Sequence, residues 1–377
     1  MRFSALFASA GLLGSAAAGA VPRGFSVPKE NGFPNPSPQQ EAQIAIQANG
    51  KLPGGALPTS LGPGSTTAFQ LIAFTELFET AYFSSLLYNI TNGVKGYEVE
   101  KSKLAEAQKI IKTVIAQEEQ HAIGALATLK SAKKWAPSPC RYQFPVNTLK
   151  DAIALAETFT AVVLGALQDA NVIFSKEGLP EVVRLISSVI GQEGEQNGFY
   201  RVYLDQIPSE SPFLTTVPAA FAWSALQGFV VPGSCDYDIK KINLPIFPPL
   251  LVNNGLVANI AAKDQTLSFQ TTLKTGSFAH RVINYKAKNG KLYITYTTGQ
   301  QLPYSVKVEN VKWVDEHTLK VEAKFPYSFL VAGGFTHAAL TTSNDFKAPD
   351  DVPSKTLAGP GIIQVQNNLD SKGSYSY

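Results

Sequence analysis

Long helical runs between about residues 66 and 205 carry ionisable side chains on the stripe that should face a core. In the run from about residue 99 to 131, apolar residues recur at steps of three and four, and the same stripe continues through Glu118 and His121. A buried carboxylate is costly unless it is paired or binds a cation. The chain must therefore fold so that these polar residues meet protons, arginines or a metal ion.

The same rhythm occurs in four successive runs, which predicts a four-helix bundle. Asn147 or Thr148 is a suitable N-cap for the third run, and Pro180 occupies a favoured first position of the fourth. Every run has a carboxylate on its inward stripe: Glu76 in the first, Glu118 in the second, Glu157 in the third and Glu193 in the fourth.

These four glutamates are predicted to lie at similar heights in the bundle. About 42 positions separate Glu76 from Glu118, and about 36 separate Glu157 from Glu193, with a turn near the middle of each interval. Each helical hairpin therefore brings its two carboxylates level. The segment of about 15 residues between the second and third runs is long enough, when extended, to cross the length of a bundle.

The second run contains Glu118-Glu119-Gln120-His121, a Glu-x-x-His sequence. Residues three apart lie on the same side of a helix, so Glu118 and His121 can bind one ion through an oxygen and a nitrogen atom. One Glu from each of two helices, with Glu-x-x-His from each of the other two, is the di-iron or di-manganese carboxylate arrangement. The fourth run has Gln196, three positions after Glu193, where the second histidine would stand.

At these residues the sequence resembles the ferritin-like superfamily. It is similar to the secreted fungal ferritin-like proteins of the late sexual development or stress-response protein family, which are related to plant desiccation-related proteins. The resemblance is carried by AFTELFETAYFSSLL, IAQEEQHAIGAL, ALAETFTAVVLGAL and VIGQEGEQNGFYR, and it covers about residues 65–245. It implies a link to fungal sexual development and stress response.

The resemblance also implies a dinuclear site for iron or manganese. The metal-binding residues that it implies are Glu76, Glu118, His121, Glu157 and Glu193. In that family the first-helix ligand is a Glu followed seven positions later by an aromatic residue, which fits Glu76 with Phe83 but not Glu79 with Leu86. Glu79 is then a reserve ligand or a neighbour of the site. The amide of Gln196 binds iron less well than an imidazole, which weakens the second metal position.

The C-terminal part has a different sequence pattern, in which short runs of β-branched and aromatic residues are separated by turn signals. We predict a small antiparallel β domain over residues 246–345, in which Asn289-Gly290 forms the turn of a hairpin, and a flexible tail over residues 346–377. The predicted fold class is α+β, a ferritin-like four-helix bundle over residues 66–245 followed by this domain. The resemblance does not extend to the β-rich part.

The N-terminus reads as a secretory signal peptide over residues 1–20, with Arg2 before a short apolar core and Ala18-Gly19-Ala20 as the cleavage site. This predicts a secreted protein, extracellular or in the cell wall. Residues 21–65 are rich in Pro and Gly and are predicted to form an extended lead-in. No later run is apolar over the length that spans a bilayer, and a net charge of +3 without a basic cluster gives no reason to expect nucleic acid.

Two cysteines in a secreted chain favour a disulfide between Cys140 and Cys235, the alternative being two separate buried thiols. Asn89-Ile90-Thr91 is an acceptor sequence for N-glycosylation at Asn89, which predicts a glycoprotein.

Two hypotheses for function remain open. The first is a secreted iron or manganese protein that reacts with oxygen species or sequesters metal. The second is a non-enzymatic extracellular structural or interaction protein with a degenerate metal site. The Glu-x-x-His sequence favours the first, and Gln196 favours the second. The sequence assigns neither an enzymatic activity nor a protein partner.

Overall fold

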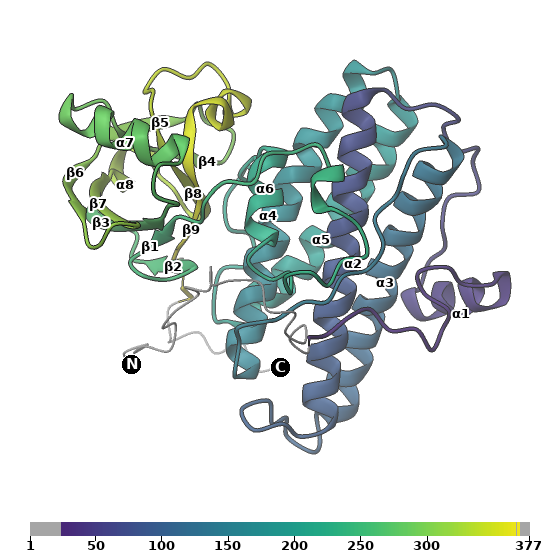
Figure 1. The fold of residues 1–377 in the computed structure, drawn as a ribbon. Coiled ribbons are helices and arrows are strands. Elements are labelled where there is room, and N and C mark those ends of the chain that lie inside the picture. Colours follow the sequence, from purple (N-terminus) through teal and green to yellow (C-terminus); the bar gives the residue numbers. More distant parts are fainter. Residues whose placement is uncertain (1–23, 367, 370–377) are drawn as a thin grey trace.

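The computed structural model describes residues 24–366, 368 and 369, so the predicted signal peptide lies outside the described residues. Helices come first along the chain and two β-sheets follow, which confirms the α+β fold class. In Figure 1 the sheets lie beside α4 (Leu149–Lys176) and α6 (Ala219–Leu226), whereas α1 (Pro38–Ala48) lies on the opposite side of the helical part.

Four long helices make the bundle. They are α2 (Pro63–Thr91), α3 (Leu104–Ser131), α4 (Leu149–Lys176) and α5 (Pro180–Tyr203). α2 packs against both α3 and α4, and α5 packs against α4. The short helix α1 packs on the outside of α3. α2 is therefore the central helix, and most of its residues are buried on every side.

The helix starts follow from local capping. The side chain of Thr148 accepts a hydrogen bond from the backbone N–H of Asp151, which confirms Thr148 as the N-cap of α4. Pro180 is the first residue of α5, where its missing N–H has no cost. These fixed starts set the heights at which Glu157 and Glu193 enter the bundle.

The β part consists of two sheets. One has four strands in the spatial order β1 (Leu251–Val252), β3 (Gln265–Thr272), β7 (Thr318–Phe325) and β6 (Glu309–Trp313). The other has five strands in the order β2 (Val257–Ile260), β9 (Thr356–Val365), β8 (Gly334–Thr341), β4 (Tyr293–Thr298) and β5 (Tyr304–Lys307). β2 and β9 run parallel and the other neighbours run antiparallel, so the part is mixed and not purely antiparallel as predicted.

The five-stranded sheet is the middle layer of the molecule. Every residue of β8 is buried, which a strand covered on one face only would not show. Ala338 and Leu340 pack into the core between the two sheets, whereas Phe335 and Ala339 pack into the core of the helical part. The helices and the sheets are therefore joined by a continuous apolar contact.

The predicted hairpin at Asn289-Gly290 is wrong. Residues 278–288, part of which we predict as a strand, form helix α7 (Phe278–Lys288), because Ser277 caps the N-terminus by accepting from the backbone N–H of His280. Asn289 is the C-cap, and Gly290 adopts a positive φ of 60°. An Asn-Gly pair suits a helix end as well as a hairpin turn, so the dipeptide alone could not separate them.

Two other segments also differ from the predictions. The predicted flexible tail, residues 346–377, contains η2 (Pro349–Lys355) and the long strand β9, which fills the place between β2 and β8. The predicted extended lead-in contains α1, which begins with a capping box between Ser37 and Gln40. The short helix α8 (Tyr327–Leu330) precedes β8, and η1 (Ile239–Lys241) follows α6.

A disulfide joins Cys140 to Cys235 and closes 95 positions of sequence. It ties the segment between α3 and α4 to the segment after α6, so the long crossover of the bundle is fixed to the layer that leads into the sheets.

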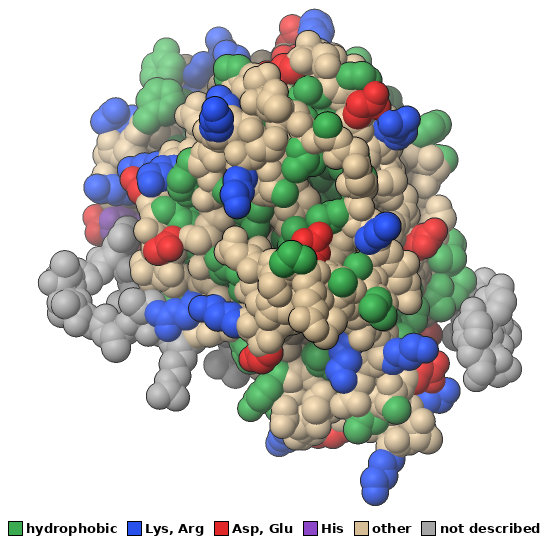
Figure 2. All heavy atoms as spheres, turned by 90° about the vertical axis from the view of Figure 1, so that its right-hand side faces the viewer, with side chains coloured by type: hydrophobic (Ala, Val, Ile, Leu, Met, Phe, Trp, Pro, Cys, Tyr) green, Lys and Arg blue, Asp and Glu red, His purple; other side chains and the backbone are tan. Residues whose placement is uncertain are grey.

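Among the described residues, α4 is the one helix long and apolar enough to cross a membrane by length and composition, and 72% of that stretch is buried inside the protein. Figure 2 shows the face that carries α1 and α3, where Lys and Arg side chains lie scattered among Asp and Glu without gathering into one patch.

Candidate metal centre

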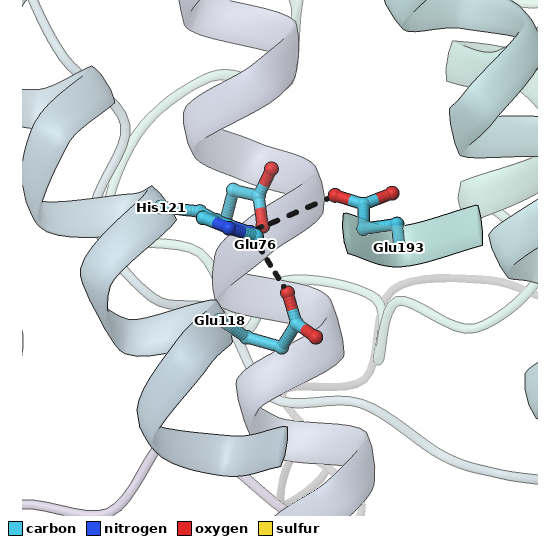
Figure 3. A group of neighbouring side chains, drawn as sticks. All are labelled: Glu76, Glu118, His121 and Glu193. Atoms are coloured by element: carbon cyan, nitrogen blue, oxygen red, sulfur yellow. Dashed lines mark hydrogen bonds and ion pairs between the residues drawn. The ribbon is translucent and has the colours of Figure 1, made fainter. Parts of the chain in front are cut away.

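Three helices bring four ionisable side chains together inside the bundle: Glu76 from α2, Glu118 and His121 from α3, and Glu193 from α5. Each offers one ligand atom, and these four atoms lie within 4.8 Å of one another. Figure 3 shows the three carboxylates directed toward the His121 ring from separate helices. We call these four residues the carboxylate–histidine cluster.

His121 is the centre of the cluster. Its Nδ1 atom lies 3.1 Å from Glu118 Oε2, 3.4 Å from Glu76 Oε2 and 3.6 Å from Glu193 Oε1. Among the described residues, neither carboxylate oxygen of Glu76 or of Glu193 has a hydrogen-bond partner. One imidazole therefore faces three carboxylates, and four buried oxygens remain without a donor.

Burial makes the charged state of this cluster expensive. Burial raises the pKa of Glu76 to about 7, although the His121 ring beside it acts in the opposite direction. Burial, with Glu76 and Glu118 nearby, raises the pKa of Glu193 well above its usual range. Burial lowers the pKa of His121, but the hydrogen bond to Glu118 and the negative charges of Glu76 and Glu118 outweigh it, so the net shift is upward. The cluster favours added positive charge, from protons or a metal ion.

The residues fit a small divalent cation. Three carboxylates and one imidazole suit iron or manganese, which accept oxygen and nitrogen ligands. With all three carboxylates ionised and the ring neutral, a divalent ion would leave one negative charge in place of three. The unpartnered oxygens of Glu76 and Glu193 are the atoms that such an ion would satisfy.

Glu157, which the sequence analysis places in the same site, is not part of the cluster. Its Oε1 atom accepts a hydrogen bond of 2.8 Å from Nη1 of Arg201, and both side chains are almost fully buried. The same Nη1 atom lies 3.5 Å from Glu210 Oε2. A guanidinium ion therefore faces Glu157, although burial still raises the pKa of Glu157 to about 7. Four of the five predicted residues come together in the cluster.

Gln196 is close to the carboxylate–histidine cluster, but the group that it directs toward the cluster is an N–H donor. Its Nε2 atom donates to Glu118 Oε1 at 2.9 Å and to Gln117 Oε1 at 3.1 Å, and its own carbonyl oxygen accepts from the Tyr200 hydroxyl. The amide thus holds the Glu118 carboxylate in place and does not offer a lone pair to an ion in this arrangement.

Glu79 lies one turn along α2 from Glu76 and is 2% exposed. Burial, then the charges of Glu193, Glu118 and Glu76, raises its pKa well above the usual range. Its Oε2 atom has no hydrogen-bond partner among the described residues. The surroundings of Glu79 therefore disfavour its charged form, and it lies beside the cluster but is not one of the four convergent residues.

The adjacent Glu119 has a different role from Glu118. Both of its carboxylate oxygens accept from Nδ2 of Asn31, at 2.8 and 2.9 Å, so it fastens the N-terminal segment to α3. Asn89 of the glycosylation acceptor lies half-buried in the last turn of α2, 13 positions after Glu76 on the same helix. Glycosylation at Asn89 stays a prediction.

Sequence reasoning missed Arg201 and Glu210. Arg201 follows Glu193 by eight positions, two helical turns, so it shares a face with Glu193 and the sequence carried a usable signal for it. Glu210 lies in the segment between α5 and α6, where periodicity gives no information.

The comparison with known families agrees with this geometry. Residues 67–206 match the family model described as Ferritin-like domain. The matched stretch reaches from α2 to the end of α5 and includes the whole carboxylate–histidine cluster. No curated protein matched the chain. Residues 67–206 are therefore a ferritin-like domain, and the two β-sheets lie outside the matched stretch.

Proposed function

We propose that the ferritin-like domain holds one iron or manganese ion between Glu76, Glu118, His121 and Glu193. The observation that carries this proposal is the convergence of four ligand atoms within 4.8 Å, with the carboxylate oxygens of Glu76 and Glu193 left without donors. Buried polar groups in proteins are almost always satisfied, so four orphaned oxygens in one place argue for a missing cation.

One ion, and not two, is what the neighbouring residues support. A second ion would need Glu157 and a ligand at position 196. Arg201 already neutralises Glu157, and Gln196 directs an N–H group toward Glu118. Without Glu157 and without a ligand at position 196, the second metal position of the dinuclear arrangement lacks its ligands. The four residues of the carboxylate–histidine cluster then form a mononuclear site.

The four side chains of this site differ in their exposure to solvent. The side chain of His121 is 15% exposed, whereas those of Glu76, Glu118 and Glu193 are each 1% exposed. His121 is therefore the member of the cluster that solvent reaches most easily, whereas the three carboxylates are buried. When bound, a carboxylate-held iron or manganese ion supplies Lewis-acid and one-electron chemistry toward small oxygen species. Glu118 is oriented for this by the N–H of Gln196.

The biological setting follows only from the sequence. We infer a secreted protein, extracellular or in the cell wall, with a role in fungal sexual development and stress response, because the N-terminal signal and the quoted motifs support that setting. The rival function, a non-enzymatic structural or interaction protein with a degenerate site, is supported by Arg201 and Gln196, which remove the second metal position.

Metal stoichiometry tests the proposal. The mature protein would be loaded with Mn²⁺, and separately with Fe²⁺ without oxygen, then desalted and measured by elemental analysis. We expect about one ion per chain for the wild type and less than about a tenth of an ion for Glu118→Gln/His121→Asn, because that variant removes half of the ligands.

Two single variants serve as matched controls. Glu119→Gln changes the buried neighbour that binds Asn31, and Glu157→Gln changes the carboxylate that binds Arg201. Both should keep one ion per chain. Two ions in the wild type, or loss of metal from Glu157→Gln, would show a dinuclear site. No metal in the wild type would leave the scaffold function.

A further inference from the structure

A cavity of about 1580 Å³ lies where the bundle meets the sheets. Its walls come from α2, α4 and α6 on one side and from the β1, β2 and β9 region on the other. Figure 1 shows the β1–β2 region beside the lower half of α4. Pockets that hold drug-sized ligands measure roughly 300–1,000 Å³, so this cavity has room for a larger molecule.

The lining of the cavity is mostly aliphatic. α4 contributes Leu155, Val162 and Leu167, and α2 contributes Leu71 and Ile72. The sheet side adds a second apolar wall, formed by Leu250, Leu251, Val252, Leu256, Val257 and Ile362. Two facing aliphatic walls suit a long apolar molecule, because burial of its surface is the main favourable contribution to binding.

The charges around the cavity exclude an anion. Among the described residues that line it, none is Lys, Arg or His, and three are acidic: Glu76, Asp151 and Glu157. Arg201 faces Glu157, and Glu76 belongs to the carboxylate–histidine cluster with His121, so both carboxylates already face a positive or titratable group of the chain. A buried carboxylate or phosphate group on the ligand would meet like charges without a partner.

The cavity connects the surface with the interior of the bundle. At one end it is lined by Asn253, Asn254 and Leu256, which are exposed in the turn between β1 and β2. At the other end it is lined by Glu76, which is 0% exposed. The lining therefore includes both exposed residues of the sheet side and a buried member of the carboxylate–histidine cluster.

We propose that this cavity binds an uncharged, lipid-like molecule with a long aliphatic chain, such as a fatty alcohol. The polar oxygen of such a ligand meets amide and hydroxyl groups in the lining, among them Thr75, Thr158 and Gln206. The proposal does not depend on metal binding, because the two facing apolar walls exist without an ion.

The experiment uses the full mature chain and an uncharged fluorescent probe, N-phenyl-1-naphthylamine. The probe should bind with about one molecule per chain, seen as a blue-shifted rise in fluorescence. Dodecan-1-ol should displace it at a concentration about tenfold lower than dodecanoate or dodecylammonium, because only the alcohol enters without an unpaired charge.

Two variants fill the cavity from different walls. Ala166 on α4 and Ala225 on α6 both line it and are half-buried, so a larger side chain can be placed there without opening a fully packed core. Ala166→Trp and Ala225→Trp should each weaken probe binding by about tenfold or more. Ala105→Trp, at an exposed position of α3 outside the lining, is the matched control and should bind as the wild type does.

The outcomes separate this proposal from the metal site. Thermal unfolding shows which of the two cavity variants folds, and metal content should be unchanged in it. Probe binding that survives in a folded cavity variant, or preferential displacement by either charged competitor, overturns the proposal. Absence of probe binding in the wild type also overturns it, whether or not the protein holds metal.

Discussion

Two groups of buried carboxylates in one bundle are compensated in opposite ways. Glu157 and Glu210 share the guanidinium group of Arg201, which belongs to the chain and is always charged. The three glutamates of the carboxylate–histidine cluster share only the ring of His121. The first group has one permanent cation for two carboxylates, whereas the second has one titratable ring for three.

The difference teaches which buried charges serve structure and which leave room for a ligand. Arg201 also donates through Nε to the backbone oxygen of Ile207, and Glu210 accepts from the backbone N–H of Phe335 on β8. That network ties α5 to the sheets. The cluster around His121 has no comparable contact with the β part, and its unpartnered oxygens carry a cost that a cation can remove.

The largest expected effect is loss of the internal cation. Arg201→Met removes the guanidinium ion that faces the buried carboxylates of Glu157 and Glu210, which should lower the free energy of unfolding by about 3–5 kcal/mol. Urea unfolding of the metal-free protein at pH 7.5 measures this. Arg184→Met, at an exposed ion pair with Glu181, is the control and should change little. Equal effects of the two substitutions would refute the structural role of Arg201.

The two buried histidines should differ in how they respond to acid. Burial lowers the pKa of His337 to about 4, and its Nε2–H group donates to Thr216. The unfolded chain therefore binds a proton between pH 6.5 and 4 that the folded chain excludes, so acid destabilises the protein. The shift corresponds to about 3 kcal/mol of unfolding free energy lost between pH 7 and 4.

His337→Gln keeps a donor for Thr216 and removes the titration. The difference in unfolding free energy between wild type and His337→Gln should therefore shrink as the pH falls from 7 to 4, when both are followed by urea unfolding at each pH. A constant difference over this range would mean that His337 is not held neutral. His121 differs because carboxylates surround it and raise its pKa.

Amide substitutions in the two groups should have opposite signs in the metal-free protein. Glu193→Gln removes a carboxylate that has no donor, so the free energy of unfolding should rise by about 1 kcal/mol. Glu157→Gln removes the partner of Arg201, so it should fall by about 1–3 kcal/mol. Thermal or urea unfolding after treatment with a chelator measures both. Destabilisation by both substitutions to the same extent would remove the distinction between the groups.

The smallest expected effect is in metal stoichiometry. Gln196→His restores the second Glu-x-x-His sequence on α5, yet the ion count should stay at one per chain, because Arg201 still holds Glu157. Elemental analysis after loading with Mn²⁺ distinguishes one ion from two. A count of two would mean that the histidine alone completes the second position and that Arg201 does not block it.

The regular part of the fold could be predicted from sequence because periodicity and capping are local. The stripes that carry Glu76, Glu118 and Glu193 identified three helices and their inward faces, and Thr148 fixed the start of a fourth. The partner of Glu157 could not be found in the same way. It depends on which of two neighbouring faces of α5 turns inward, and on Glu210 from an irregular segment.

The β part was less predictable because its pairings are not local. The strand β9 pairs with β2, which lies about 100 residues earlier in the chain. The sequence of β9 alone does not predict this pairing. Asn289-Gly290 satisfied the rule for a hairpin equally well, but Ser277 upstream made the segment a helix. In both places the outcome depends on residues outside the window that a sequence pattern covers.

The position of β9 has a consequence for biosynthesis. Among the described strands, β2 pairs in the sheet with β9 alone, and β8 needs β9 to cover its second edge, yet β9 follows β2 by about 100 residues along the chain. The ribosome completes every helix of the bundle long before that strand exists. The helical part can therefore fold on the nascent chain, whereas the middle sheet closes only after β9 has left the ribosome, and until then its open edges can pair with other chains.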